Sequence, residues 1–489
     1  MQNSFYIRYR KALAATQNWS GLWQDCYSYT LPSFGANAIS RNGGGPDRSI
    51  ERLFDATAPD AVDQLAASLL GHLTPPFTAW FGLKAGPTID DEQASLLAPV
   101  LEKSATIMLG HFERSNLLVE LHQCFLDLVI GGTACLFFEQ TEAGADSAFR
   151  FTALPLREAV LADSGSGRLD CLYRTIRMSG AQLAKRYDVD EDTLSADEAD
   201  YIEAIEPDDK GGYSLSLWPF SGDDSTESIA VEKLDYAPFI AFRWMKSPGE
   251  AYGRSPIMKV LPDIKTANKV VELILKNASI AVTGIWQAED DGVLNPANIE
   301  LVPGAIIPKA MGSRGLTPLE MPGRFDVSQL VLDDLRSRIR HALLIDRLPA
   351  ASAYRMTATE ILERSSEMGL LLGATYGRLQ IELLHPLLLT AWKILRGRGE
   401  VPDLLVDGRS VQFDYRAPLA RSQAQRHVQS TISWLQTVAM LGGDAMSSVD
   451  TVQASRYLGD ALGVPTTLML SEIPIPPTEN LIPTGDELL

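Results

Sequence analysis

The chain has 489 residues, 45% of them hydrophobic and 21% charged, enough for two to four ordinary domains or one elaborate subunit. Its formal net charge of −19 argues against a general nucleic-acid binder, which usually carries a basic excess. The charge does not exclude a protein that encloses DNA without gripping it, because acidic walls release few counterions on contact.

The N-terminal quarter is expected to be mainly helical. Four helices are predicted, over 1–30, 58–73, 91–114 and 116–130. Trp19 and Trp23 are spaced to share one face of the first helix. Pro75 and Pro76 stop the second helix, and an extended segment, TPPFTAWFGL, begins there.

Residues 133–246 change character to short runs with β-forming residues, separated by turn residues. We expect six to eight strands in this subdomain, with DSGSGR as a hairpin tip. One helix is predicted at SGAQLAKRY, where Ser179 and Gln182 stand at capping-box spacing.

Two long helices follow, with a compact insertion between them. The first, over 256–283, has apolar residues at steps of three and four, and Pro262 lies in its first two turns. The insertion, 284–325, is rich in glycine and proline, and IELVPGAIIP suggests short strands around a turn. The second helix covers 326–345.

The next segment, 346–356, is a loop of small, basic and proline residues between two strong helices. Thr357 and Glu360 then form a capping box that starts a very long helix. This helix runs to His385-Pro386 or, with a kink there, to Arg396. One or two strands follow in DGRSVQFDYRAPLA, then further helices over 421–463 and a proline-rich tail. The pattern predicts an α+β fold dominated by helices.

Motifs for catalysis and metal binding are missing or weak. There is no GxxxxGK[ST], no HExxH and no GxSxG, and the six histidines are scattered. The acidic run EDD at 289–291 could hold a divalent ion, but a solvated turn is the simpler interpretation. We therefore expect no cofactor, no metal and no enzymatic activity.

The cysteines and the apolar runs bear on the compartment. Cys26, Cys124, Cys135 and Cys171 form no CxxC pair, and two of them have apolar neighbours, which predicts buried free thiols. The N-terminus lacks the apolar core of a signal peptide, and no stretch predicts a transmembrane helix. We expect a protein made and kept in a cytosol, or in a particle assembled there.

The two long helices carry basic residues that admit two interpretations. The residues are Lys265, Lys269 and Lys276 on the first helix and Arg336 and Arg340 on the second. They form either a solvated face paired with Glu272, Asp333 and Asp334, or part of the lining of a DNA tunnel. Arg347 and Arg355 bracket the loop between the helices, where flexible cations suit brief contacts with phosphates.

The order of elements and several stretches resemble the portal (head-to-tail connecting) proteins of short-tailed bacteriophages. The matching stretches are WSGLWQDCYSYTLP (19–32), LFDATAPDAVDQLAASLLGHLTPPFTAWFGL (53–83), GEAYGRSPIMKVLPDI (249–264), RMTATEILERSSEMGLLLGATYGRLQIELLHPLL (355–388) and SVDTVQASRYLGDALGVP (448–465). They occur in the right order and together touch most of the chain. The β-rich region matches only in general character.

The resemblance implies a ring of twelve subunits at one capsid vertex, through which DNA enters during packaging and leaves at infection. It implies the portal fold of wing, stem, clip and crown. The implied parts are an N-terminal wing (1–255), stem helices (256–283 and 326–345), a clip (284–325), a tunnel loop (346–356), a C-terminal wing (357–420) and a crown with the tail (421–489).

Within the tunnel loop, the resemblance implies that a small set of side chains faces the DNA. These are Arg347, Ser352, Tyr354 and Arg355. We expect the loop to act as a valve or brake that touches the passing backbone without reading bases.

The implied partners are the other subunits of the ring, double-stranded viral DNA bound without sequence specificity, the terminase large subunit, a tail adaptor protein, the major capsid protein and internal core or ejection proteins. No membrane partner is implied. The implied location is the portal vertex of the virion, after assembly in the host bacterial cytoplasm. The alternative is another structural phage protein, such as a capsid shell or head-completion component.

Overall fold

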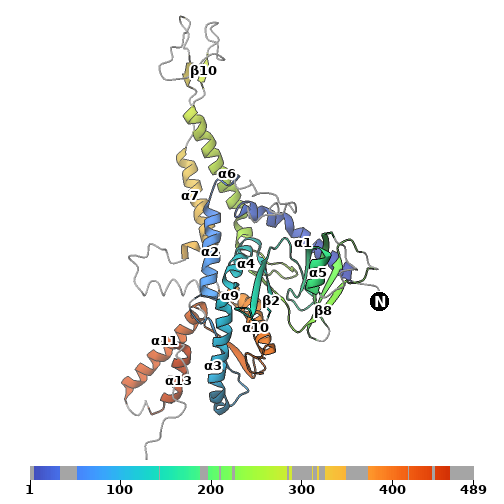
Figure 1. Ribbon diagram of the computed structural model, residues 1–489. Helices are drawn as coiled ribbons and strands as arrows, with labels where there is room; N and C mark the ends of the chain where they lie inside the picture. The colour runs from blue at the N-terminus through green and yellow to red at the C-terminus, as the bar shows by residue number, and fades with distance from the viewer. Residues whose placement is uncertain are drawn as a thin grey trace, which may run out of the picture.

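The computed structural model describes residues 5–32, 52–76, 78–142, 144–187, 197–208, 211–222, 226–283, 286–288, 311, 316–318, 325–347, 373–416, 418–442 and 447–462. The expected mixture of helices and strands is confirmed. Figure 1 shows a body of helices and strands from which two long helices project in one direction and a helix pair in another.

The N-terminal quarter contains the four expected helices. They are α1 (Phe5–Ser28), α2 (Thr57–Leu73), α3 (Asp91–Arg114) and α4 (Leu117–Gly131). From Cys124 to Gly131, α4 is buried on every side, so this half of the helix lies inside the body. It ends at Gly132, whose φ of 79° is in the left-handed region that favours glycine.

In the described part of the β-rich region, the strands β2 to β9 form two antiparallel sheets, and their number agrees with the six to eight strands expected. The first has the order β3-β2-β9, from β3 (Phe149–Leu154), β2 (Thr133–Gln140) and β9 (Phe239–Arg243). The second has the order β4-β5-β6-β7-β8, from β4 (Val160–Ala162), β5 (Cys171–Met178), β6 (Ala199–Pro207), β7 (Tyr213–Pro219) and β8 (Ala230–Leu234). The predicted helix is α5 (Gly180–Tyr187), and Gln182 Oε1 accepts a hydrogen bond from the Ser179 N–H at 3.0 Å.

Helices α6 (Pro256–Thr283) and α7 (Phe325–Ala342) lie side by side and extend away from the body (Figure 1). At their far end β10 (Trp286–Ala288) pairs antiparallel with β11 (Leu316–Pro318). The strands expected in IELVPGAIIP and the acidic run at 289–291 lie outside the described residues. After α7 the chain enters a short 3-10 turn, η6 (Ile345–Arg347).

The later helices are consecutive segments of one rod: α9 (Gly373–Leu379), the π-helical turn η7 (Gln380–Leu384) and α10 (His385–Gly397). The helix therefore passes through His385-Pro386, and the predicted start at Thr357 lies outside the described residues. Strand β12 (Val411–Tyr415) then pairs antiparallel with β1 (Phe81–Ala85). The chain continues into α11 (Pro418–Leu441) and α13 (Thr451–Leu462).

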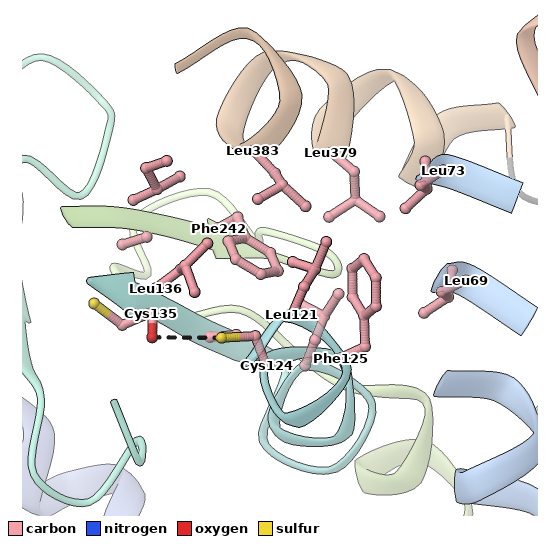
Figure 2. Packing of buried hydrophobic residues seen from close by; sticks show 14 of the residues in the cluster. Leu69, Leu73, Leu121, Cys124, Phe125, Cys135, Leu136, Phe242, Leu379 and Leu383 are labelled. Carbon is pink, nitrogen blue, oxygen red and sulfur yellow. Dashed lines mark hydrogen bonds between the residues drawn. The ribbon is translucent and has the colours of Figure 1, made fainter. Parts of the chain in front are cut away.

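One large hydrophobic core joins the elements of the body to the near ends of α6 and α7 (Figure 2). Side chains from α2, α4, β2, β9, α9 and η7 meet in the part drawn there, namely Leu69, Leu73, Leu121, Phe125, Leu136, Phe242, Leu379 and Leu383. Beside them the Cys124 thiol donates a hydrogen bond to the Cys135 carbonyl oxygen at 3.6 Å. Burial raises the pKa of the Cys135 thiol to about 12. All four cysteines are buried and free, as predicted.

A second, smaller core attaches the beginning of α1 to the five-stranded sheet. The ring of Phe5 stacks on Trp218 with centroids 4.2 Å apart. The Arg8 guanidinium donates two hydrogen bonds to Glu206, at 2.8 and 2.7 Å. Because α1 also contacts α4 and α6, it connects the sheet to the body.

None of the described helices is both long and apolar enough to cross a membrane.

Candidate functional site

The basic residues predicted as a tunnel lining are distributed along α6, α7 and η6. The innermost of them on α6, Lys265, has its Nζ 2.7 Å from Asp25 Oδ2 and 5.5 Å from the centroid of the Tyr29 ring. Asp25 lies in the last turn of α1, and Tyr29 directly follows the helix. Lys265 therefore fastens α6 to α1.

Further along α6, one carboxylate serves two lysines. Glu272 lies 2.9 Å from Lys269 Nζ and 2.6 Å from Lys276 Nζ. The hydrogen bonds from Lys276 and Lys269 lower the pKa of Glu272, so this carboxylate stays ionised. Both lysine side chains remain more than 60% exposed. Two exposed cations therefore share the Glu272 carboxylate, which is the pairing named in the first interpretation of these residues.

On α7, Arg336 contacts a residue at the beginning of α2. Its Nε and Nη2 both lie 2.9 Å from Asp55 Oδ2, and the Asp55 side chain is only 4% exposed. The other carboxylate oxygen accepts the N–H of Thr57, the first residue of α2, at 2.9 Å. Burial by itself would raise the pKa of Asp55, but the hydrogen bonds from Thr57 and Arg336 outweigh it and lower that pKa.

The same short segment is held from the other side by α6. The buried Asn268 amide oxygen accepts the N–H groups of Phe54 and Asp55 at 2.6 and 3.1 Å. Its Nδ2 donates to the Arg52 carbonyl oxygen at 3.1 Å. We call the segment 52–57 with its two holders, Asn268 on α6 and Arg336 on α7, the α6–α7 clamp.

The sequence interpretation missed the α6–α7 clamp. A weak local signal was available, since Asp55 precedes the Thr-initiated helix in FDATAPD at a spacing suited to a cap. Asn268 carries no such signal, because a lone asparagine on a helix is usually a surface residue. Its role depends on a segment more than 210 residues earlier in the chain.

The remaining predicted residues are Arg340 on α7 and the residues of the loop that follows it. Arg340 is exposed, and no salt bridge of its guanidinium occurs within the described ranges. The neighbouring carboxylate of Asp334 pairs instead with Arg338, at 2.6 Å. Arg347 ends η6, directly after Leu344 turns the chain with a φ of 61°. Three predicted residues, Ser352, Tyr354 and Arg355, lie outside the described residues.

The two long helices also carry exposed apolar side chains. Leu273 and Leu275 on α6 are 48% and 53% exposed, and Leu330 on α7 is 74% exposed. Val331 is similarly exposed. Apolar residues that persist along two neighbouring helices indicate a surface that another protein covers.

A cavity of about 330 Å³ lies between α1, α4 and the turn after β3. At its wall Asp127 accepts a hydrogen bond from the Tyr27 hydroxyl at 2.6 Å. Burial raises the pKa of Asp127 to about 6, against the opposing effect of that hydrogen bond. Within the part of the chain that the structure describes, no three His, Cys, Asp or Glu side chains gather as metal ligands would.

Comparison with known proteins shows which family the chain belongs to. Residues 4–470 match the family described as "Bacteriophage head to tail connecting protein". The chain is 25% identical to the "Probable portal protein" of Bordetella phage BPP-1 over 488 residues, covering 93% of this chain and 86% of the relative. It is 23% identical to the "Portal protein" of Enterobacteria phage T3, covering 91% and 84%.

A further relative and one solved structure complete the comparison. The chain is 24% identical to the "Portal protein" of Escherichia phage T7 over 396 residues, covering 78% of this chain and 72% of the relative. Among solved structures, a chain of "Neck of native GTA particle computed with C12 symmetry" aligns with a TM-score of 0.34 and 12% identity, over 77% of this chain and 86% of that chain.

Proposed function

The chain belongs to the bacteriophage head to tail connecting protein family, and on this premise we propose that twelve copies form a ring through which double-stranded DNA passes. Its role is that of a portal protein, which connects head and tail. The length of the family match, from residue 4 to residue 470, supports this role for nearly the whole chain. The chain thus serves as a virion component.

The projecting helices support a division into wing, stem and clip. We assign α6 and α7 to the stem, because they run side by side away from the body (Figure 1). The strand pair β10–β11 at their far end belongs to the clip, over 284–325. The body with its two sheets forms the wing, and α11 and α13 belong to the crown, over 421–489.

Exposed apolar residues on the stem carry the ring proposal. A single copy leaves Leu275 and Leu330 half or more exposed, on helices that project away from the body (Figure 1). In a closed ring the α6–α7 pair of one subunit would cover the corresponding pair of the next. The contact buries apolar surface that would otherwise promote indiscriminate association.

The electrostatics of the stem suit passage of DNA more than retention. On α6, Lys265, Lys269 and Lys276 are each already paired with a carboxylate, at 2.6–2.9 Å. Lys265 has a carboxylate of its own, whereas Lys269 and Lys276 share Glu272, so a phosphate that approaches these lysines meets partly neutralised cations and releases few counterions. A net charge of −19 per subunit, multiplied around the ring, further discourages adhesion. Arg340, whose guanidinium is exposed, is the stem residue best placed for transient contact.

The loop over 346–356 remains the proposed contact between the ring and DNA. It follows the end of α7 in the chain, and Arg347 and Arg355 bracket it. Replacing both arginines with alanine should leave rings intact and alter DNA retention or packaging. Retention equal to that of the wild-type protein would refute the valve.

The proposal includes partners that remain to be identified. The clip would meet the terminase large subunit during packaging and the tail adaptor afterwards, and the wing would meet the major capsid protein. The crown would face internal core or ejection proteins. Hydrolysis of ATP belongs to the terminase in this scheme, so purified protein should show neither ATPase nor nuclease activity.

Electron microscopy of the purified protein tests the function directly. Class averages with about twelve subunits around a hole wide enough for duplex DNA are expected. A monodisperse monomer at every concentration would overturn the ring. A shell-like lattice would favour the alternative of a capsid component.

A further inference from the structure

The rod formed by α9, η7 and α10 contains a local change of helical winding. Leu379 and His385, on either side of η7, both have helical dihedral angles, so the rod is continuous. Within the turn, the His385 N–H donates to the Gln380 carbonyl oxygen, five residues back. A π-helical turn of this kind is rare and often marks a functional position in a helix.

Pro386 supplies a local cause for the turn. Proline has no N–H, and its ring collides with the carbonyl group four residues earlier, here that of Glu382. Widening the preceding turn relieves this collision. Pro386 thus weakens the regular helix at this point, so the rod has a natural hinge there.

The Glu382 side chain leaves the rod at this hinge and enters a fully satisfied buried ion pair. Its Oε1 accepts Arg243 Nη2 at 2.7 Å, and its Oε2 accepts Arg243 Nε at 3.1 Å. Oε2 also accepts the backbone N–H of Arg243 at 3.0 Å. The two side chains are 8% and 1% exposed. Arg378, one turn earlier, adds a weaker contact at 3.3 Å.

Arg243 in turn connects the hinge to the base of the stem. It ends β9, and its Nη1 donates to the Ala251 carbonyl oxygen at 3.0 Å, just before α6. Its Nη2 also donates to the Gly167 carbonyl oxygen in the β4–β5 hairpin at 3.1 Å. Gly253 lies so close to Arg243 that a Cβ there would come within 2.9 Å of the arginine Cβ. These contacts hold the Arg243 side chain in place independently of Glu382.

Hydrophobic packing alone does not fix the angle of the hinge. Leu379 and Leu383 rest on Phe242 and the surrounding core (Figure 2), and such contacts tolerate small rotations of a helix. A bidentate pair between a planar guanidinium and a carboxylate is directional. Replacing a buried ion pair with apolar residues is often neutral for stability, so its better-supported contribution is to select one arrangement.

We propose that the Arg243–Glu382 pair is a lock that sets the angle and register of α9 at the Pro386 hinge, relative to the base of α6. With the lock broken, α9 turns or frays about η7 while α10 keeps its place in the core. On the proposed function, α9 lies at the far end of the segment that follows the stem, so the lock is a positioning device for the DNA-contacting loop.

Hydrogen exchange measured by mass spectrometry on the assembled full-length protein tests the lock. In Glu382→Gln the bidentate charge-assisted pair is lost, and exchange of peptides covering 373–384 should accelerate by about tenfold or more. Peptides covering 388–396 should keep the wild-type rate. Ile381→Ala is the matched control, because Ile381 lies in the same turn but is 54% exposed.

Two further variants keep the outcome interpretable. Glu382→Asp retains the charge and shortens the reach, so it should accelerate exchange of 373–384 to a lesser extent even if Glu382→Gln fails to fold. Adding Pro386→Ala to Glu382→Gln should restore slow exchange, since a regular helix can then form without the lock. Equal acceleration over 373–384 and 388–396, or no rescue by Pro386→Ala, would overturn the hinge. These measurements need no DNA. A result that refutes the lock therefore leaves the proposed portal function untouched, and a failure of the portal function leaves the lock untouched.

Discussion

Replacing Asn268 with alanine tests whether the α6–α7 clamp holds these two helices to the body. The substitution removes the acceptor for two backbone N–H groups and the donor for one carbonyl oxygen. Leaving the buried Asp55 N–H without an acceptor costs about 1–3 kcal/mol, and leaving the partly exposed Phe54 N–H without one adds about 1 kcal/mol. Alanine recovers about 0.6 kcal/mol through its higher helix propensity. The net loss should be about 1.4–3.4 kcal/mol.

The measurement is urea denaturation followed by tryptophan fluorescence. Protein concentration must be equal for every variant, because assembly adds a concentration-dependent contribution to apparent stability. Thr266→Ala is the matched control on the same helix, since Thr266 is exposed and its hydroxyl only donates back to the Pro262 carbonyl oxygen. Limited proteolysis should also cut segment 52–57 faster in Asn268→Ala.

Equal stability of Asn268→Ala and Thr266→Ala would refute the clamp. It would mean that water replaces the asparagine at no cost, and that segment 52–57 is held by Arg336 alone. A large loss of stability without faster proteolysis of 52–57 would place the damage elsewhere on α6.

Three other predictions follow from the same structure. Because the pKa of Asp127 in the folded protein, about 6, exceeds its unfolded value of 3.8, its contribution to stability is complete below pH 3.8 and is lost as pH rises toward 6. The free energy of unfolding of Asp127→Asn, relative to that of the wild type, should therefore rise by up to about 3 kcal/mol between acid and neutral pH. Denaturation across that pH range measures this difference, and a difference that does not change with pH would contradict the burial argument. Gly132→Ala should lower the free energy of unfolding by about 2–4 kcal/mol, because a Cβ would collide with the Gly253 carbonyl oxygen as well as strain the backbone. Gly144→Ala is the control and should cost about 1 kcal/mol, since a Cβ there meets no neighbouring atom. Similar losses for the two variants in thermal melts would show that the backbone angle alone determines the cost. Leu330→Asp should abolish rings in electron micrographs while leaving the circular dichroism spectrum unchanged, and rings of normal yield would remove α7 from the subunit interface.

The amino-acid sequence by itself determined the local structure. Helical spans, the capping box before α5, the β-rich character of 133–246 and the two long helices around an insertion depend on periodicity and on caps within a few residues. The interpretation of Cys124 and Cys135 as buried thiols also follows from their apolar neighbours. The resemblance to portal proteins rested on stretches of this kind, in their order along the chain, and the family match over 4–470 agrees with it.

Only the tertiary structure decided which residues pair across the chain. Periodicity identified Lys265 and Arg336 as cations on helical faces, but their partners, Asp25 and Asp55, lie 240 and 281 residues away. Helix spacing records which residues share a face and carries no information on what that face meets. The Arg243–Glu382 lock illustrates the same limit. Pro386 predicted a weak point in the helix, but the arginine that pairs with Glu382 there comes from a strand 139 residues earlier in the chain.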